Sequence, residues 1–435
     1  MNVRSRTLSL FAAVGLLYVA VGVLQSWPLA LTILNDGLIV AITALGVNMQ
    51  WGYAGLFNVG VSGFFALGGL AVVLVSMPLD AAAWSAGTPR LLVALAILAA
   101  IVAAAMRLYR MLGAGWSRVA SLVVFLAIGV TIFRIVFNPA ASAVEAINPA
   151  VTGNIGGLGL PVPLSFFIAG AFAAAAGWMV AKIALGLRSD YLAIATLGIG
   201  QIVISVLMNE SWLDRGVKNV VGISRWPVPD EVRLQKQSWF IDLAHALGMR
   251  LTTTSTVFVA LCFAALFTTI LLVILLLAEL SLRSPWGRMM RAIRDNEVAA
   301  EAMGKDVKRR HLQVFVLGCA VIGIAGALFV MLHGLFAPVN YNDALRYTFL
   351  IWAMVILGGS GSNWGSVLGA LIVMLIWDEA GSVGPHLFAL LTSPLADGPL
   401  KTHLVNSAVE MRLPAVGLVL LLVLRFSPKG LIPES

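Results

Sequence analysis

The sequence predicts an all-α, polytopic membrane protein with about 10–12 transmembrane or partial membrane segments, some of them broken or re-entrant. Two observations predict this fold class. Of the 435 residues, 60% are hydrophobic and only 11% are charged, whereas charged residues make up about a quarter of soluble domains. The apolar residues also form runs of membrane length between polar loops. We expect one membrane domain, residues 1–435, because no soluble segment exceeds about 50 residues.

Apolar runs give the candidate membrane segments in chain order. Nine runs are candidates for full crossings: 8–25, 29–50, 56–77, 90–106, 119–137, 163–183, 190–209, 256–282 and 312–333. Three shorter runs, 347–359, 366–378 and 414–426, are expected to be half-helices or re-entrant pieces. Arg4 and Arg6 precede the first run, as in a signal peptide, but the run has no small-x-small cleavage site. We therefore expect an uncleaved first span.

The distribution of charge predicts which loops face the cytoplasm. If the N-terminus is inside and every candidate crosses, the inner segments hold 17 Lys/Arg against 7 acidic residues, and the outer ones hold 11 against 13. Cytoplasmic loops carry such a basic excess. Both termini and residues 283–311 are therefore predicted inside, and residues 210–255 form the largest outer loop. This bias explains the net charge of +8, and no nucleic-acid partner is expected because no soluble basic domain is present.

The basic stretch 283–311 has the signals of two short helices. It contains eight Lys/Arg and four acidic residues between two long apolar runs. Ser284 can cap a first helix, and Asp295 or Asn296 can cap a second one. Gly304 suits a left-handed stop after it. We predict two short helices with a bend between them, lying along the membrane.

This stretch is either a solvated linker that fixes topology or a docking element for a cytoplasmic partner. Glu297, Ala299, Ala300 and Gly304 form the pattern E-x-A-A-x-x-x-G, which resembles the coupling motif of ABC-importer permeases. Small residues allow a partner's surface to approach a helix closely. We therefore assign these four residues to ATPase coupling.

The sequence has no pattern typical of catalysis. No G-x-x-x-x-G-K-[ST] phosphate-binding loop occurs, and residues 357–362, LGGSGS, are expected to be a tight break between short helices. Cys262 and Cys319 lie inside apolar runs, and the five His residues are scattered. We expect no catalytic residue, no metal ligand and no cofactor.

Polar groups inside apolar runs are the usual markers of a transport pathway. The ionisable ones lie near the ends of the predicted spans, which argues against a proton relay: Asp36, Arg134, Glu210, Glu279 and Asp378. Small residues and uncharged polar groups combine in segments 48–69 and 190–201, although such groups more often form interhelical hydrogen bonds. We predict that the pathway is lined from these two segments. The predicted lining residues are Asn48, Asn58, Gly63, Thr196 and Gln201.

Five stretches, in this order, resemble one family, the membrane subunits of branched-chain amino acid ABC importers of the LivM type. They are Asn48–Gly69, Gly186–Gln201, Arg283–Gly304, Leu357–Ala370 and Arg425–Ile432. The family commonly has a His where this chain has Val61, and a T-G-G-x-x-G-I loop where it has residues 214–223. These departures concern the choice of substrate.

The resemblance implies a permease without its own nucleotide-binding site in a bacterial inner membrane, transporting branched-chain or related hydrophobic amino acids. Its implied partners are a second, LivH-like permease subunit, two cytoplasmic ATPase subunits and a periplasmic substrate-binding protein. One alternative is a permease of the same family for urea or short amides. Another is an ion-coupled secondary transporter. A requirement for ATP or for an ion gradient separates these classes.

Overall fold

The computed structural model describes residues 3–113, 115–148, 153–186, 189–391, 393, 398, 402–404 and 407–434. Among these residues, nine helices are long and apolar enough to cross a membrane. They are α1 (Val3–Leu24), α2 (Trp27–Ala54), α5 (Thr88–Met111), α6 (Trp116–Glu145), α7 (Val162–Ala184), α8 (Ser189–Asn209), α12 (Leu251–Arg283), α15 (Val307–His333) and α18 (Asn363–Leu391). Three shorter helices accompany them: α3 (Val61–Ser76), α17 (Leu350–Gly358) and α20 (Arg412–Phe426). The predicted all-α, polytopic membrane fold is confirmed.

Two predicted segments differ from the helices that form. The run 366–378 was expected to be a short piece, and this is wrong, because α18 continues to Leu391. Its acidic pair, Asp378 and Glu379, lies inside this helix, and Gln25 donates to the Glu379 carboxylate at 2.6 Å. The run 56–77 yields only the 16-residue helix α3, because residues 55–60 are not helical.

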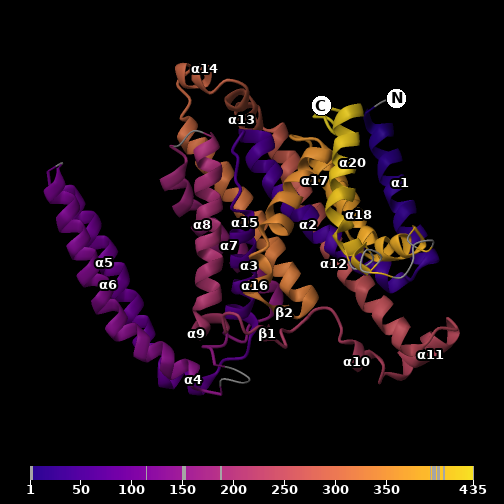
Figure 1. Ribbon diagram of the computed structural model, residues 1–435, viewed down its shortest axis with the longest axis horizontal. Coiled ribbons are helices and arrows are strands. Elements are labelled where there is room, and N and C mark those ends of the chain that lie inside the picture. Colours follow the sequence, from indigo (N-terminus) through magenta and orange to yellow (C-terminus); the bar gives the residue numbers. More distant parts are fainter. Residues whose placement is uncertain are drawn as a thin grey trace.

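The centre of the bundle is α15, which packs against α2, α3 and α7 (Figure 1). Glycines allow the helix backbones to approach closely here. A Cβ at Gly68 would overlap the carbonyl of Gly323, and one at Gly326 would overlap the carbonyl of Phe65. Any larger side chain at these two crossings would push α3 away from α15.

Helices α5 and α6 form a hairpin that stands away from the rest of the bundle (Figure 1). Its main neighbours outside the hairpin are the short helices α4 (Ala81–Ala86) and α9 (Ser211–Asp214). Trp212 of α9 is buried and lies 5.8 Å from the Phe137 ring of α6. This contact attaches the base of the hairpin to the 210–255 loop.

The polar connections gather at two opposite ends of the bundle. One end holds α13 (Pro285–Asp295) and α14 (Glu297–Ala302), together with the start of α1 and the end of α20 (Figure 1). The other end holds α9, α10 (Glu231–Leu234), α11 (Ser238–Ala246) and α16 (Pro338–Tyr341). There β1 (Val220–Val221) pairs antiparallel with β2 (Leu335–Phe336), with Val220 opposite Phe336. The 283–311 stretch and both ends of the described chain therefore lie on the same side.

Candidate functional site

The 283–311 stretch folds into the two short helices that the sequence predicts. Ser284 Oγ accepts from the Gly287 amide at 3.4 Å and caps α13. Of the two predicted caps for the second helix, the structure uses Asn296, whose side chain accepts from the Ala299 amide at 3.0 Å. Gly304 has φ +76°, the left-handed conformation expected for a stop. The chain bends between the two helices because Asn296, with an extended backbone, is both the residue that follows α13 and the cap of α14.

The four residues predicted to couple to an ATPase differ in exposure. Glu297 and Ala299 are exposed on α14, with Val298 and Met303 beside them at 77% and 79% exposure. Ala300 is turned inward and is only 9% exposed. Its small side chain lies where α14 packs against α15, and the exposed surface of α14 is made by the other residues. Nothing lies within 4 Å of a Cβ built on Gly304.

Arg294, near the end of α13, connects this segment to the end of α2. Its guanidinium donates to the Gly52 carbonyl and pairs with the Glu434 carboxylate at 2.9 Å. Gly55 ends α2 with φ +68°, and its Cβ position is 3.7 Å from the Arg294 side chain. Glu297 borders a cavity of about 190 Å³ beside Gly55. The 283–311 stretch thus contacts the C-terminal end of α2, where the chain leaves the helix toward α3.

Asn58 holds the non-helical segment between α2 and α3. Its Nδ2 donates to Gln50 Oε1 at 2.8 Å, and its Oδ1 accepts from the Gly60 amide at 2.9 Å. Gln50 in turn donates to the Phe315 carbonyl of α15 at 2.9 Å, and Trp352 Nε1 donates to the Asn58 carbonyl at 3.0 Å. These bonds tie the break to α2, α15 and α17.

Segment 190–201 of α8 packs against the same non-helical segment between α2 and α3. The Val59 amide donates to Thr196 Oγ1 at 3.0 Å. A Cβ on Gly63 would lie 2.7 Å from the Gly200 Cα, so α3 and α8 touch through glycines. Gln201 is half-buried on α8. A larger residue at position 63 would separate the two helices.

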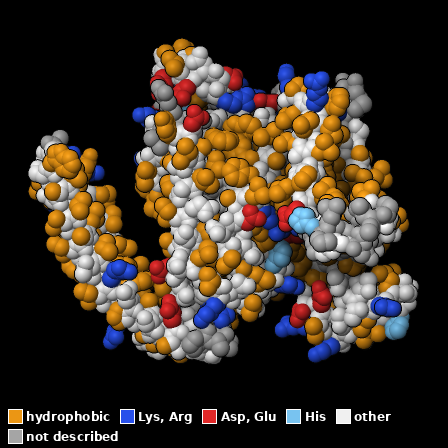
Figure 2. All heavy atoms as spheres, in the orientation of Figure 1, with side chains coloured by type: hydrophobic (Ala, Val, Ile, Leu, Met, Phe, Trp, Pro, Cys, Tyr) orange, Lys and Arg blue, Asp and Glu red, His pale blue; other side chains and the backbone are white. Residues whose placement is uncertain are grey.

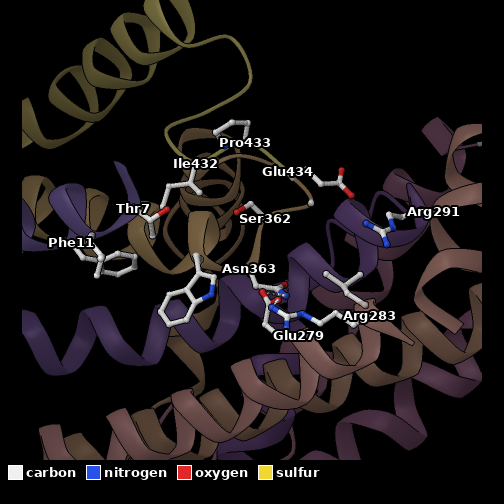
Figure 3. Close-up of a pocket in the computed structure, with 14 residues that line it drawn as sticks. Thr7, Phe11, Glu279, Arg283, Arg291, Ser362, Asn363, Ile432, Pro433 and Glu434 are labelled. Carbon is white, nitrogen blue, oxygen red and sulfur yellow. Dashed lines mark hydrogen bonds and ion pairs between the residues drawn. The ribbon is translucent and has the colours of Figure 1, made fainter. Parts of the chain in front are cut away.

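Asn48 belongs to a second polar network, which reaches a cavity of about 840 Å³ (Figure 3). Its Nδ2 donates to Asn363 Oδ1 at 3.1 Å, and its Oδ1 accepts from the Gly361 amide at 2.8 Å. Asn363, at the start of α18, also donates to Glu279 Oε1 at 3.1 Å. Figure 3 shows Asn363 and Glu279 pointing toward each other, with Glu434 from the tail beside the cavity. The network joins α2, α12 and α18 at the end of the bundle that carries α13.

The structure therefore places three of the five predicted pathway residues, Asn58, Gly63 and Thr196, at the α2–α3 break, and it places Asn48 in the separate network with Gly361 and Asn363. Arg294, Asn363 and Glu434 form contacts at the same end of α2 and were missed by sequence reasoning. Their partners are far away in the chain: Arg294 and Gly52 are 242 residues apart, and Arg294 and Glu434 are 140 apart. No local pattern marks such contacts.

One expectation about charge is wrong. Asp378 was expected near the end of a span, yet it is the 16th of the 29 residues of α18. Asp36 is the tenth of the 28 residues of α2. The error follows from the underestimated length of α18, because helix continues for 13 residues beyond Asp378.

A model of the family described as "branched-chain amino acid transport system / permease component" matches residues 29–148 and 112–393. The high-affinity branched-chain amino acid transport system permease protein LivM of Escherichia coli (strain K12) is 33% identical over 240 residues, covering 54% of each chain. The same protein of Salmonella typhimurium (strain LT2) is 32% identical over the same shares. A probable LivM of Methanocaldococcus jannaschii is 26% identical over 294 residues, covering 67% of this chain and 74% of the relative. The chain spans about half the length of the first two relatives. No solved structure matches.

Proposed function

Because this chain belongs to the family of branched-chain amino acid transport permease components, we propose that it is the membrane-spanning permease subunit of an ABC importer. It translocates branched-chain or related hydrophobic amino acids across the inner membrane of a bacterium. The observation that carries the proposal is the exposed surface of helix α14. This helix directly follows α13, whose Arg294 side chain donates a hydrogen bond to the Gly52 carbonyl near the end of α2. A transporter driven from outside its own membrane domain needs such a connection.

The proposed complex contains a second, LivH-like permease subunit, two cytoplasmic ATPase subunits and a periplasmic substrate-binding protein. ATP is hydrolysed by the ATPase subunits, which dock on Glu297, Val298, Ala299 and Met303. When the ATPases close, they displace α14 and α13. Arg294 transmits this displacement to Gly52, and the joint of Asn48, Asn58, Gly63 and Thr196 opens or closes the inner half of the pathway. Gln201 completes the proposed lining.

Uptake into proteoliposomes tests this function. The complex is reconstituted with all four kinds of subunit, and uptake of leucine, urea and acetamide is measured with ATP or with an imposed proton or sodium gradient. We expect saturable leucine uptake that requires ATP and the binding protein. Uptake driven by a gradient without ATP would instead identify a secondary transporter. ATP-driven uptake of urea or acetamide in place of leucine would identify the alternative substrate class of this family.

Cysteine labelling tests the proposed orientation, in which both termini and α14 face the cytoplasm. Met303→Cys, Pro433→Cys and Val232→Cys are introduced separately after Cys262 and Cys319 are replaced. Residues 303 and 232 are exposed at opposite ends of the bundle, at 79% and 56%. An impermeant thiol reagent added to intact cells should label only Val232→Cys, and permeabilisation should expose the other two. Labelling of Met303→Cys in intact cells would reverse the orientation.

A further inference from the structure

The cavity of about 840 Å³ beside Asn363 lies at the end of the bundle that carries α13. Its walls come from α1, α12, α13, the start of α18 and the C-terminal tail. Arg291 and Glu434 lie on one side of it, and Thr7 and Phe11 of α1 lie on the opposite side (Figure 3). Figure 2 shows Lys and Arg side chains gathered at this end of the molecule, next to a broad hydrophobic surface. The cavity therefore lies where a polar end of the bundle meets its apolar face.

Four charged side chains line this cavity, and one of them has no partner of opposite charge. Glu434 pairs with Arg294 at 2.9 Å, and Glu279 lies 3.9 Å from Arg283. Arg291 is half-buried and forms no ion pair within the part of the chain that the structure describes. A guanidinium that loses water without gaining a partner is destabilising. An anionic group in the cavity would remove this cost, and the two carboxylates would attract a cation.

An apolar furrow continues from the cavity along α1. It has a volume of about 290 Å³ and lies between α1, α2 and α18, and Phe11 borders both the cavity and the furrow. The side chains that line it are apolar or aromatic, and the Tyr18 hydroxyl is turned to the Leu371 carbonyl at 3.1 Å. From Thr7 in the cavity to Val19 in the furrow, α1 rises about 18 Å at 1.5 Å per residue. One leaflet of a bilayer has a hydrocarbon thickness of about 15 Å. The polar cavity and the apolar furrow together therefore match the length of one lipid.

We propose that the cavity and the furrow bind one phospholipid whose head group carries a primary ammonium, as in phosphatidylethanolamine. Arg291 takes the phosphate, because a guanidinium presents paired donors that fit phosphate oxygens. Glu279 and Glu434 take the ammonium. One acyl chain leaves the cavity past Phe11 and lies in the furrow, where burial of its methylene groups is favourable.

The pattern of charge in the cavity favours this head group over the other common ones. The N–H groups of a primary ammonium are hydrogen-bond donors, which the carboxylates of Glu279 and Glu434 can accept. A choline group has no N–H donor, and a glycerol head group has no positive charge. Either would leave the two carboxylates less well matched than ethanolamine does.

This site goes beyond the proposed function, because it lies beside α1 and not at the α2–α3 break. Only 22% of the apolar window of α1 is buried by the described part of the chain. A lipid in the furrow adds contacts between α1 and α18 and also touches the tail at Glu434. With α13 on the cytoplasmic side, as proposed, the lipid belongs to the inner leaflet.

Native mass spectrometry of the assembled complex, stripped of lipid and then titrated with one phospholipid at a time, tests the head-group contacts. We expect the wild type to bind phosphatidylethanolamine about tenfold more tightly than phosphatidylcholine or phosphatidylglycerol. Arg291→Gln should weaken the binding of all three lipids about tenfold, because all carry the phosphate and a charged hydrogen bond is lost. Arg309→Gln is the matched control, since Arg309 is exposed and outside the cavity, and it should change nothing.

Glu279→Gln separates the ammonium from the phosphate. The Gln side chain keeps an acceptor for Asn363, which donates to Glu279 at 3.1 Å, but it removes the charge. Binding of phosphatidylethanolamine should fall about tenfold, whereas binding of phosphatidylcholine should stay the same. Equal losses for both lipids would contradict the assignment of the ammonium to Glu279.

A glycine in the furrow allows a test of the acyl chain. A Cβ built on Gly15 or on Gly417 meets no described atom within 4 Å, so a larger side chain fits at both positions. Gly15 lines the furrow, and Gly417 lies on α20 outside it. Gly15→Phe should fill the furrow and weaken the binding of every phospholipid about tenfold, and Gly417→Phe should have no effect.

Competition distinguishes a lipid from a soluble phosphate ester. Glycerophosphoethanolamine has the same head group without acyl chains, and it should not displace phosphatidylethanolamine at equal concentration. Equal displacement would identify a site for soluble phosphate esters and would overturn the proposal. An intact complex that binds no phosphatidylethanolamine, or binds it equally in the wild type, Arg291→Gln and Gly15→Phe, would also overturn it. The furrow would then be covered by a helix of another membrane subunit.

Discussion

Replacing Ala299 by Trp should abolish ATP-driven uptake while leaving the permease inserted and paired with its membrane partner. Ala299 is exposed on α14, so the indole does not disturb the fold of the permease itself. It would stand between α14 and the ATPase surface, where a packed interface has no spare volume. Both uptake and substrate-stimulated ATPase activity should fall by more than about tenfold, which corresponds to roughly 1.4 kcal/mol of lost docking free energy.

Three further variants locate the cause of this loss. Arg309→Gln, an exposed change on the same stretch, should be nearly silent. Ala300→Trp should also stop uptake, but by displacing α14 from α15, because Ala300 is buried between them. Gly304→Val should misdirect the end of the segment, since φ is +76° there and a β-branched residue disfavours that conformation. Normal uptake by Ala299→Trp in a verified complex would make the stretch a solvated linker.

Replacing Arg294 by Gln should uncouple ATP hydrolysis from transport. Gln is shorter and uncharged, so both the hydrogen bond to the Gly52 carbonyl and the ion pair with Glu434 are lost. The surface of α14 is unchanged, and the ATPases still dock. We expect ATPase activity close to that of the wild type, with uptake per ATP hydrolysed lower by about tenfold, as for the loss of one charged hydrogen bond.

Neighbouring positions separate transmission from general charge effects. Arg288→Gln, on the exposed side of α13, removes the same charge without a bond to α2 and should leave uptake per ATP unchanged. Glu434→Gln removes only the ion pair and should have an intermediate effect. Equal uptake per ATP in Arg294→Gln and the wild type would show that the displacement reaches the pathway by another route.

The sequence by itself determined the class of fold, the approximate place of the long helices and the two short helices of the 283–311 stretch. These features depend on local chemistry. A run of about 20 apolar residues spans a bilayer wherever it occurs. A cap acts within three or four residues of the helix end. Ser284 and Asn296 therefore begin helices, and Gly304 follows the end of one, as their residue types predict.

Tertiary structure decided the length of α18, the direction of Ala300 and the contents of the site. The acidic residues after Trp377 looked like the end of a span, but the helix continues through them to Leu391, and Glu379 accepts a hydrogen bond from Gln25 in the α1–α2 connection. Whether Ala300 faces α15 or solvent depends on how α14 packs, which the spacing of small residues does not specify.

The contacts at the end of α2 show both contributions. Segments 48–69 and 190–201 could be paired from composition alone, because small and uncharged polar residues are typical of close helix contacts. Arg294 differs, because its partners lie far away in the chain: Gly52 is 242 residues from it, and Glu434 is 140 residues from it. A charge has no periodic signal, and its meaning depends on which other charges the fold places beside it. Only the packing of α13, α2 and the C-terminal tail brings Arg294 to these two partners.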